Sequence, residues 1–190
     1  MSDVTEFVDQ LKQWGRRETG EQRTAMAELR RGLQEFPRLA PYMHRYLASF
    51  TLYKEGWEKQ SYYLVAALFA RYHSGSREPV YSDRAWDNMG SYFAAVARLQ
   101  EAGGSIERRF NALLTAHPQD LHYHLRQAVA FLQGNTEIVL PINWERMLRD
   151  ILNWDDDDRR SRVQEAWATE FWRHKARTAE EDNPETETVN

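Results

Sequence analysis

Apolar residues recur at the spacing of an α-helix along almost the whole chain, and segments that alternate between apolar and polar residues are scarce. Near the N-terminus, Val4, Phe7, Val8 and Leu11 form one such stripe, which Gly15 ends. Residues three or four positions apart share one face of a helix, so each stripe predicts a helix that packs against its neighbours. The sequence therefore predicts an all-α protein of roughly nine helices.

The segment at residues 62–70 is apolar on every side of a helix, a pattern that predicts a central buried helix. Proline and glycine residues separate the other helices, and the pair Gly103-Gly104 is a strong helix stop. We expect two packed helical bundles, an N-terminal one over residues 1–102 and a C-terminal one over residues 103–177. Residues 178–190 have five acidic residues, no basic residue and no apolar periodicity, which predicts a disordered acidic tail.

Length and composition exclude several classes of protein. A chain of 190 residues buries enough surface to fold without disulfides or metals, and the absence of cysteine rules out disulfides and thiolate zinc sites. No apolar run approaches the roughly 18 residues of a membrane span, and the first residues do not resemble a secretory signal. These features predict a cytoplasmic protein with no membrane partner.

Motifs of enzyme active sites are absent from the sequence. There is no glycine-rich phosphate loop, no nucleophile elbow and no Cys–His pair. His122 and His124 stand two positions apart, which places them about 200° apart on a helix, and Pro118 separates them from His117. The four aspartates at 155–158 lack the spacing and the glycine of a calcium loop, and they suit the start of a helix. We therefore predict no catalytic residue, no metal site and no cofactor.

Arginine dominates the basic residues. Of the 25 lysines and arginines, 21 are arginine, and only Lys12, Lys54, Lys59 and Lys175 are lysine. The net charge is −4, but without the five acidic residues of the tail the chain has 25 basic and 24 acidic residues, about +1. Arginine has a planar set of N–H donors that suits phosphate. A genome that favours arginine codons would produce the same count.

The arginines are also clustered. One group surrounds the turn after Gly15, a second lies on the following predicted helix, and the others lie on predicted helices of the C-terminal half. The groups are Arg16, Arg17 and Arg23; Arg30 and Arg31; Arg108 and Arg109; Arg126, Arg146 and Arg149; and Arg159, Arg160 and Arg162. Such clusters favour binding to phosphates. The alternative is a solvated surface with local ion pairs, such as Arg149 with Glu145.

Several blocks of the sequence resemble a known family. They read L-R-R at 29–31, S-I-E-R-R-F-N-A-L-L at 105–114, L-x-x-x-L-R at 121–126, I-N-W-E-R-M-L-R-D-I-L-N-W at 142–154 and V-Q-E-A-W-A-T-E-F-W at 163–172. In order and spacing the chain resembles the CasB-type small subunit of the type I-E CRISPR Cascade complex, from about residue 4 to residue 173. The acidic tail is not part of the family pattern.

The resemblance implies a non-catalytic, all-helical subunit of a crRNA-guided surveillance complex. The implied partners are the backbone and large subunits of Cascade, a second copy of this chain, the crRNA, and the target and non-target DNA. Base pairing reads sequence in such complexes, so the implied function is to hold the nucleic-acid backbone, stabilising the guide–target duplex and the displaced strand of the R-loop in antiviral defence. The implied nucleic-acid-binding residues are Arg30, Arg31, Arg108, Arg109, Arg126, Arg159, Arg160 and Arg162.

A helical protein–protein adaptor is the alternative function. In an adaptor the arginines would form only ion pairs within the protein. The positions of the arginines in the folded protein distinguish the two functions, because one continuous basic stripe favours nucleic-acid binding and scattered arginines favour the adaptor.

Overall fold

The computed structural model describes residues 3–76, 79–99, 103–135 and 137–181. In these residues all regular secondary structure is helical, apart from an isolated bridge between Tyr81 and Ile142. The prediction of an all-α fold is confirmed. The helices in this part of the chain are α1 (Asp3–Gly15), α2 (Gly20–Gly32), the 3₁₀ helix η1 (Pro41–Met43), α3 (His44–Thr51), α4 (Gly56–Tyr72), α5 (Met89–Leu99), α6 (Gly103–Leu114), the 3₁₀ helix η2 (Pro118–Asp120), α7 (Leu121–Gly134), α8 (Trp144–Leu152) and α9 (Asp157–Glu181).

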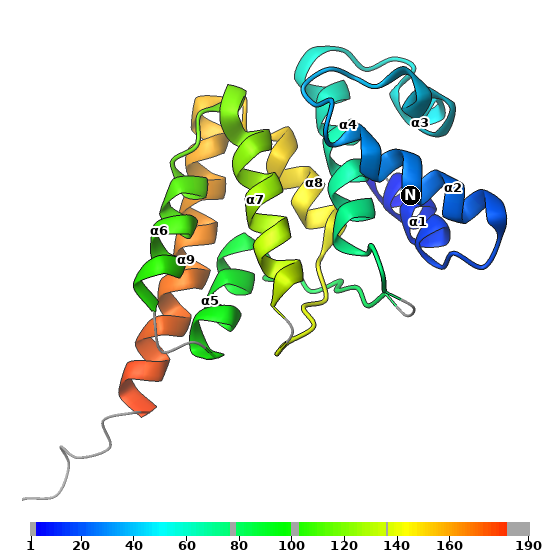
Figure 1. Cartoon of the computed structure of the whole chain (residues 1–190). Helices are drawn as coiled ribbons and strands as arrows, with labels where there is room; N and C mark the ends of the chain where they lie inside the picture. The colour runs from blue at the N-terminus through cyan, green and yellow to red at the C-terminus, as the bar shows by residue number, and fades with distance from the viewer. Residues whose placement is uncertain (1–2, 77–78, 100–102, 136, 182–190) are drawn as a thin grey trace, which may run out of the picture.

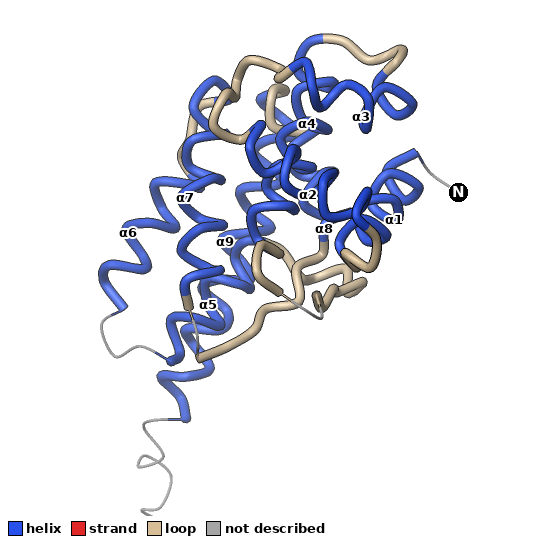
Figure 2. Tube along the Cα trace, turned by 45° about the vertical axis from the view of Figure 1, so that its right-hand side comes forward, coloured by secondary structure: helices blue, strands red, loops and turns tan. Residues whose placement is uncertain are grey.

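The helices form two groups that meet along the middle of the molecule. α1, α2 and α3 lie on one side, α5, α6 and α9 lie on the other, and α4, α7 and α8 lie between them (Figure 1). The view in Figure 2 keeps α1, α2 and α3 together, away from α6. α4 packs against α2, α7 and α8, and α8 also packs against α1. One hydrophobic core includes residues from each α-helix of the described chain, so the two groups share their interior.

α4 is the central buried helix that the sequence predicted. Every residue from 61 to 70 is buried, because neighbouring helices cover all its faces. Polar atoms near the start of α4 have partners on other helices. The indole N–H of Trp57 donates to the carbonyl oxygen of Ile151 in α8 (2.7 Å), and the hydroxyl of Tyr62 donates to Asp3 in α1 (2.8 Å). These hydrogen bonds connect α4 to α1 in the N-terminal half of the chain and to α8 in the C-terminal half.

α5 and α9 pack together over a long interface and approach closely at Gly90. A Cβ atom at this position would lie 1.8 Å from the carbonyl oxygen of Trp167, so only glycine fits. Trp167 is fully buried, and its indole N–H donates to Asp150 in α8 (2.7 Å). α5 precedes the predicted bundle boundary at 102/103 and α9 follows it, so helices from the two predicted bundles pack directly together.

α9 extends further than the sequence predicted. It ends at Glu181, so residues 178–181 are helical although the tail was predicted to be disordered from residue 178. The alanine and two glutamates at 179–181 are strong helix formers, and the first helix breaker is Pro184. The prediction rested on the absence of apolar periodicity. Such periodicity indicates that a helix packs against other elements, and a segment that lacks it can still be helical. Residues 182–190 of the predicted tail lie outside the described residues.

Gly90→Ala tests the close approach of α5 and α9. The new methyl group would overlap the Trp167 carbonyl, and the two backbones would have to separate to make room. We expect a loss of stability of about 1–3 kcal/mol or more in urea denaturation. Gly104→Ala is the matched control, because a Cβ there meets no atom within 4 Å, and we expect it to retain or slightly increase stability. Equal, small effects at the two glycines would contradict the close approach.

His73 follows α4 and is buried against α8. Its Nε2 accepts a hydrogen bond from the indole N–H of Trp144 (3.1 Å), and its ring centre lies 4.6 Å from that of Phe69. Burial, together with the positive charge of Arg17, lowers the pKa of His73 to about 3. The imidazole is therefore neutral in the folded protein at physiological pH.

We expect the protein to lose stability as the pH falls below about 6.5, the ordinary pKa of histidine. Between that pH and about 3, residue 73 binds a proton in the unfolded chain but not in the folded protein. Each pH unit in this window should lower the free energy of unfolding by up to about 1.4 kcal/mol. Urea denaturation at several pH values measures the slope. His73→Gln, which keeps an acceptor for Trp144, should flatten it, and an unchanged slope in this variant would assign the effect to other groups.

Candidate nucleic-acid interface

The eight predicted arginines lie on four helices. α2 carries the first two, α6 the next two, α7 carries Arg126, and α9 carries the last three. All are exposed except Arg160, which is half-buried. α6 packs against α7 and α9, whereas α2 packs against α1 and α4 on the other side of the molecule (Figure 1). The fold thus places six of the eight on neighbouring helices and two on the opposite group.

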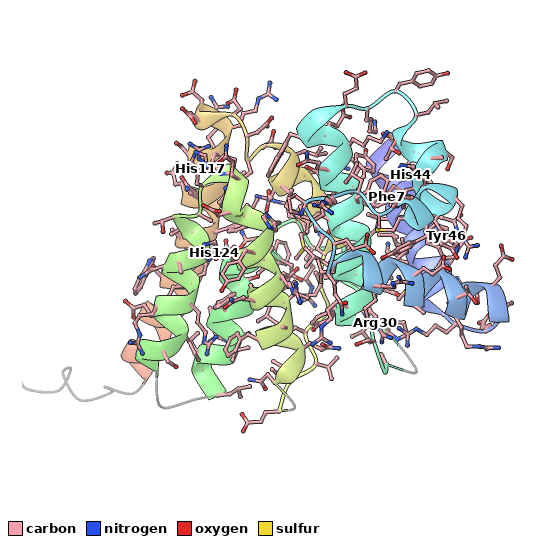
Figure 3. All side chains as sticks on the ribbon, turned by 45° about the horizontal axis from the view of Figure 1, so that its top comes forward. Phe7, Arg30, His44, Tyr46, His117 and His124 are labelled. Atoms are coloured by element: carbon pink, nitrogen blue, oxygen red, sulfur yellow. The ribbon has the colours of Figure 1, made fainter. Side chains whose placement is uncertain are left out.

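Arg108 and Arg109 line a groove of about 340 Å³ between α6 and α7. Their positions follow from the helical period, because Ile106 and Phe110 fill the core and the two arginines between them stay exposed. The side chains from α7 include His124, which Figure 3 labels. The groove is lined by Phe93, Ser105, Arg108, Arg109, Ala112, Tyr123, His124, Gln127, Ala128 and Phe131.

Cationic and aromatic groups meet in this groove. The Arg109 guanidinium lies 5.4 Å from the centre of the Phe131 ring, and Tyr123 is 55% exposed. Within the described residues, no carboxylate forms an ion pair with Arg108 or Arg109. Guanidinium groups bind phosphates and exposed aromatic rings stack on bases, so this groove has the chemistry that holds single-stranded nucleic acid.

Tyr123 and His124 were not among the binding residues predicted from the sequence. His124 was considered only as a metal ligand, and Tyr123 was not considered. A usable signal was present, because Leu121 and Leu125 mark the buried face of α7 and neither Tyr123 nor His124 lies on it. An exposed tyrosine beside arginines on an adjacent helix becomes informative only when that helix is known.

Arg126 lies on α7 but does not line the groove. It is exposed and four residues from His122, and residues at this spacing share a helix face. The ring of His122 lies 5.2 Å from that of Phe36, in the segment that follows α2. Arg126 therefore lies between the groove, which Tyr123 lines three residues away, and the edge of α7 where His122 contacts Phe36.

Arg30 and Arg31 occupy the last turn of α2. The Arg31 guanidinium lies 4.9 Å from the centre of the Tyr42 ring, a cation–π arrangement that orients it without neutralising its charge. Arg30 is exposed, and Figure 3 labels it on α2. These two arginines remain available to an anionic partner.

Arg159, Arg160 and Arg162 lie in the first turns of α9. Arg160 bonds within the protein, because it pairs with Asp157 (2.5 Å) and donates to the carbonyl oxygen of Trp154 (3.1 Å). Arg159 and Arg162 are exposed. Of the three, Arg160 is the least available to a ligand.

Ion pairing separates the predicted arginines from others in the chain. Seven of the eight form no ion pair with a carboxylate among the described residues, and Arg160 is the exception. By contrast, Arg45 pairs with Glu28 (2.5 Å) and Arg146 pairs with buried Asp150 (2.8 Å). The charges of Arg45, Arg146 and Arg160 are thus neutralised within the protein, whereas the other seven predicted arginines have no such ion pair in the described residues.

The described part of the chain contains neither a candidate metal site nor a candidate membrane-spanning helix. It contains no group of three or more His, Cys, Asp or Glu side chains arranged to hold a metal ion. None of its helices combines the length and the apolar character needed to cross a membrane.

Fold and site together describe an all-α protein whose main surface chemistry is a set of exposed arginines. The family model described as "CRISPR-associated protein Cse2" matches residues 25–172. A CRISPR-associated protein Cse2 from Thermus thermophilus is 33% identical over 180 residues, which cover 90% of this chain and 91% of that protein. The chain belongs to the Cse2 family of CRISPR-associated proteins. The resemblance to CasB-type small subunits is thereby confirmed.

Solved structures of related proteins have the same fold. CasB of M. ruber has a TM-score of 0.72 and 31% identity, covering 94% of this chain and 97% of that one. A Cse2-family protein of Thermus thermophilus has a TM-score of 0.70 and 29% identity, covering 90% and 99%. A chain of a CRISPR RNA-guided surveillance complex has a TM-score of 0.72 at 22% identity, covering 95% and 98%, and at this identity it shows the fold alone.

Proposed function

We propose that this protein is the non-catalytic small subunit of a CRISPR RNA-guided surveillance complex. Its membership of the Cse2 family supports the proposal, as does the similarity of its fold to a chain of such a complex. The partners in this proposal are the backbone and large subunits of the complex, a second copy of this chain, the crRNA, and the target and non-target DNA.

Within the complex, the protein binds the nucleic-acid backbone without sequence preference. The groove between α6 and α7 carries this part of the proposal, because Arg108 and Arg109 stand there without a carboxylate partner in the described chain, beside exposed Tyr123. Guanidinium–phosphate bonds and aromatic stacking do not depend on base identity. Such contacts stabilise the guide–target duplex and the displaced strand of the R-loop, while base pairing supplies the specificity.

The adaptor alternative requires arginines that are neutralised within the protein. Arg45 and Arg160 fit that description, since each pairs with a nearby carboxylate. The seven predicted arginines other than Arg160 have no carboxylate partner in the described residues. This difference favours binding to an external polyanion over a purely structural role.

Alanine substitutions of Arg108 and Arg126 test the proposal in the assembled, crRNA-loaded complex. Each substitution should weaken target-DNA binding severalfold and to a similar degree on unrelated target sequences, because phosphate contacts carry no base information. The log–log slope of affinity against salt should become shallower by about 0.7–0.9 for each lost contact. The lifetime of the opened target should also shorten, with the pairing rules of the guide unchanged.

Arg45→Ala is the matched control. It removes an arginine whose charge Glu28 already neutralises, so it should leave affinity and salt slope unchanged. A complex that carries both Arg108→Ala and Arg126→Ala and keeps its affinity, salt slope and opened-strand lifetime would overturn backbone binding and favour the adaptor.

A further inference from the structure

The groove between α6 and α7 is accessible and cationic. Arg108 and Arg109 are exposed along it, and none of the described residues that line it is an aspartate or a glutamate. The Arg109 guanidinium lies over the ring of Phe131, an arrangement that holds the cation at the groove without neutralising its charge. A segment of protein that carries carboxylates would find the same binding partners there as a nucleic-acid backbone.

The end of α9 lies close to this groove. Gln164 of α9 donates to the carbonyl oxygen of Leu114, at the end of α6 (2.6 Å). Further along α9, the ring of Phe171 stacks on that of Phe110 (4.3 Å between ring centres). α9 therefore runs antiparallel to α6, and Figure 1 shows its end projecting beyond the start of α6.

The chain that follows α9 is long enough to reach the groove. At about 1.5 Å per residue, Glu181 lies about 15 Å beyond Phe171 and therefore about 12 Å beyond the level of Arg108. The chain must also pass α6, which has a diameter of about 10–12 Å with its side chains. Residues 182–190, which lie outside the described residues, span up to about 30 Å when extended, at about 3.3 Å per residue.

The charge of this segment is complementary to that of the groove. It contains Asp182, Glu185 and Glu187 and has no lysine or arginine. Other predicted arginines are further from its start, because those of α2 belong to the opposite group of helices (Figure 1). Even Arg162, on α9 itself, lies about 28 Å from the end of that helix. The groove between α6 and α7 is thus the cationic site that the segment reaches most easily.

We propose that residues 182–190 dock in the groove between α6 and α7 and compete there with nucleic acid. This contact rests on the proposed function, because it regulates the same groove. Exposed ion pairs are individually weak, but a short tether gives the segment a local concentration of the order of millimolar. Docking therefore lowers the affinity of the unassembled subunit for free nucleic acid by a severalfold factor.

A spin label on the segment tests the docking directly in the full-length chain. The sequence has no cysteine, so Thr188→Cys gives a single labelling site. The label should broaden the NMR signals of Tyr123 and His124 at about 0.1 M salt. The broadening should disappear at about 1 M salt, where the Debye length falls to about 3 Å.

The double variant Arg108→Ala/Arg109→Ala should lose most of this broadening at low salt as well. Both side chains are exposed, so the variant should fold, and its melting temperature reports this. Broadening that is confined to the end of α9, or that the double variant retains in full, would overturn the docking.

Mixed samples distinguish docking within one chain from docking between two copies. One population carries the isotope label without the spin label, and the other carries the spin label without the isotope. Docking within one chain leaves the isotope-labelled signals sharp. Broadening of the Tyr123 and His124 signals in this mixture would place the segment of one copy in the groove of another and contradict the intramolecular contact.

Neutral substitutions in the segment test the competition. Together, Asp182→Asn, Glu185→Gln and Glu187→Gln should raise the affinity of the full-length chain for single-stranded oligothymidylate by roughly three- to tenfold at low salt. The same three changes should give little gain in the Arg108→Ala/Arg109→Ala background, because the docking site is absent there. Oligothymidylate should also remove the spin-label broadening from the wild-type groove, and broadening that persists would show that the two ligands do not compete.

A matched triple variant controls for net charge. Glu18→Gln, Glu21→Gln and Glu55→Gln remove three exposed carboxylates from the N-terminal group of helices and change the net charge by the same amount. We expect a clearly smaller gain in oligothymidylate affinity from this variant. Equal gains from the two triple variants would assign the effect to net charge, and the competition would be wrong.

The outcomes separate the docking from the proposed function. If the spin label detects no contact while Arg108→Ala weakens target-DNA binding in the assembled complex, the docking is wrong and the function stands. If the label detects the contact but the Arg108 and Arg126 substitutions leave target-DNA binding unchanged, the proposed function fails and the groove binds the segment alone.

Discussion

The burial of α4 on all sides is the constraint on which the rest of the structure depends. Residues 61–70 are buried without interruption, so helices from both halves of the chain must pack around them. Hydrogen bonds fix the orientation of this helix: Tyr62 bonds to Asp3 in α1, and the Tyr72 hydroxyl donates to the carbonyl oxygen of Leu140 (2.7 Å). Because α2 and α7 both pack on α4, it also sets the relative positions of the arginines that these helices carry.

Seven of the eight predicted arginines are functional candidates because no carboxylate of the described residues forms an ion pair with them. Half-buried arginines such as Arg146 and Arg160 pair with carboxylates, and removing them would damage packing. Arg108 and Arg126 have no such partner in the described residues, so their charges stay available to attract a polyanion. Arg17 is the intermediate case, because it is half-buried and its Nε has no hydrogen-bond partner within the described chain.

Helical periodicity predicted the elements of this fold but not the contacts between them. The all-α class and the burial of residues 62–70 followed from local patterns, which a helix expresses within a few turns. The groove beside Tyr123 depends on the packing of α6 against α7, and the approach of the Tyr81 hydroxyl to Gly15 joins segments far apart in the sequence. The close approach at Gly90 is of the same kind, because a glycine near a helix start has no local signature of a backbone crossing. The family resemblance identified candidate arginines without their surroundings, so it could not distinguish Arg160 from its unpaired neighbours.

A structure of the assembled complex with crRNA and target DNA, determined by electron cryomicroscopy, tests the central claim most directly. The quantity to measure is the distance from the Arg108 and Arg109 guanidinium nitrogens to the nearest acceptor atoms. Backbone binding requires phosphate oxygens at roughly 2.7–3.2 Å, with no hydrogen bond from these side chains to a base edge. A groove between α6 and α7 that is filled by acidic side chains of another subunit, with nucleic acid elsewhere, would contradict it.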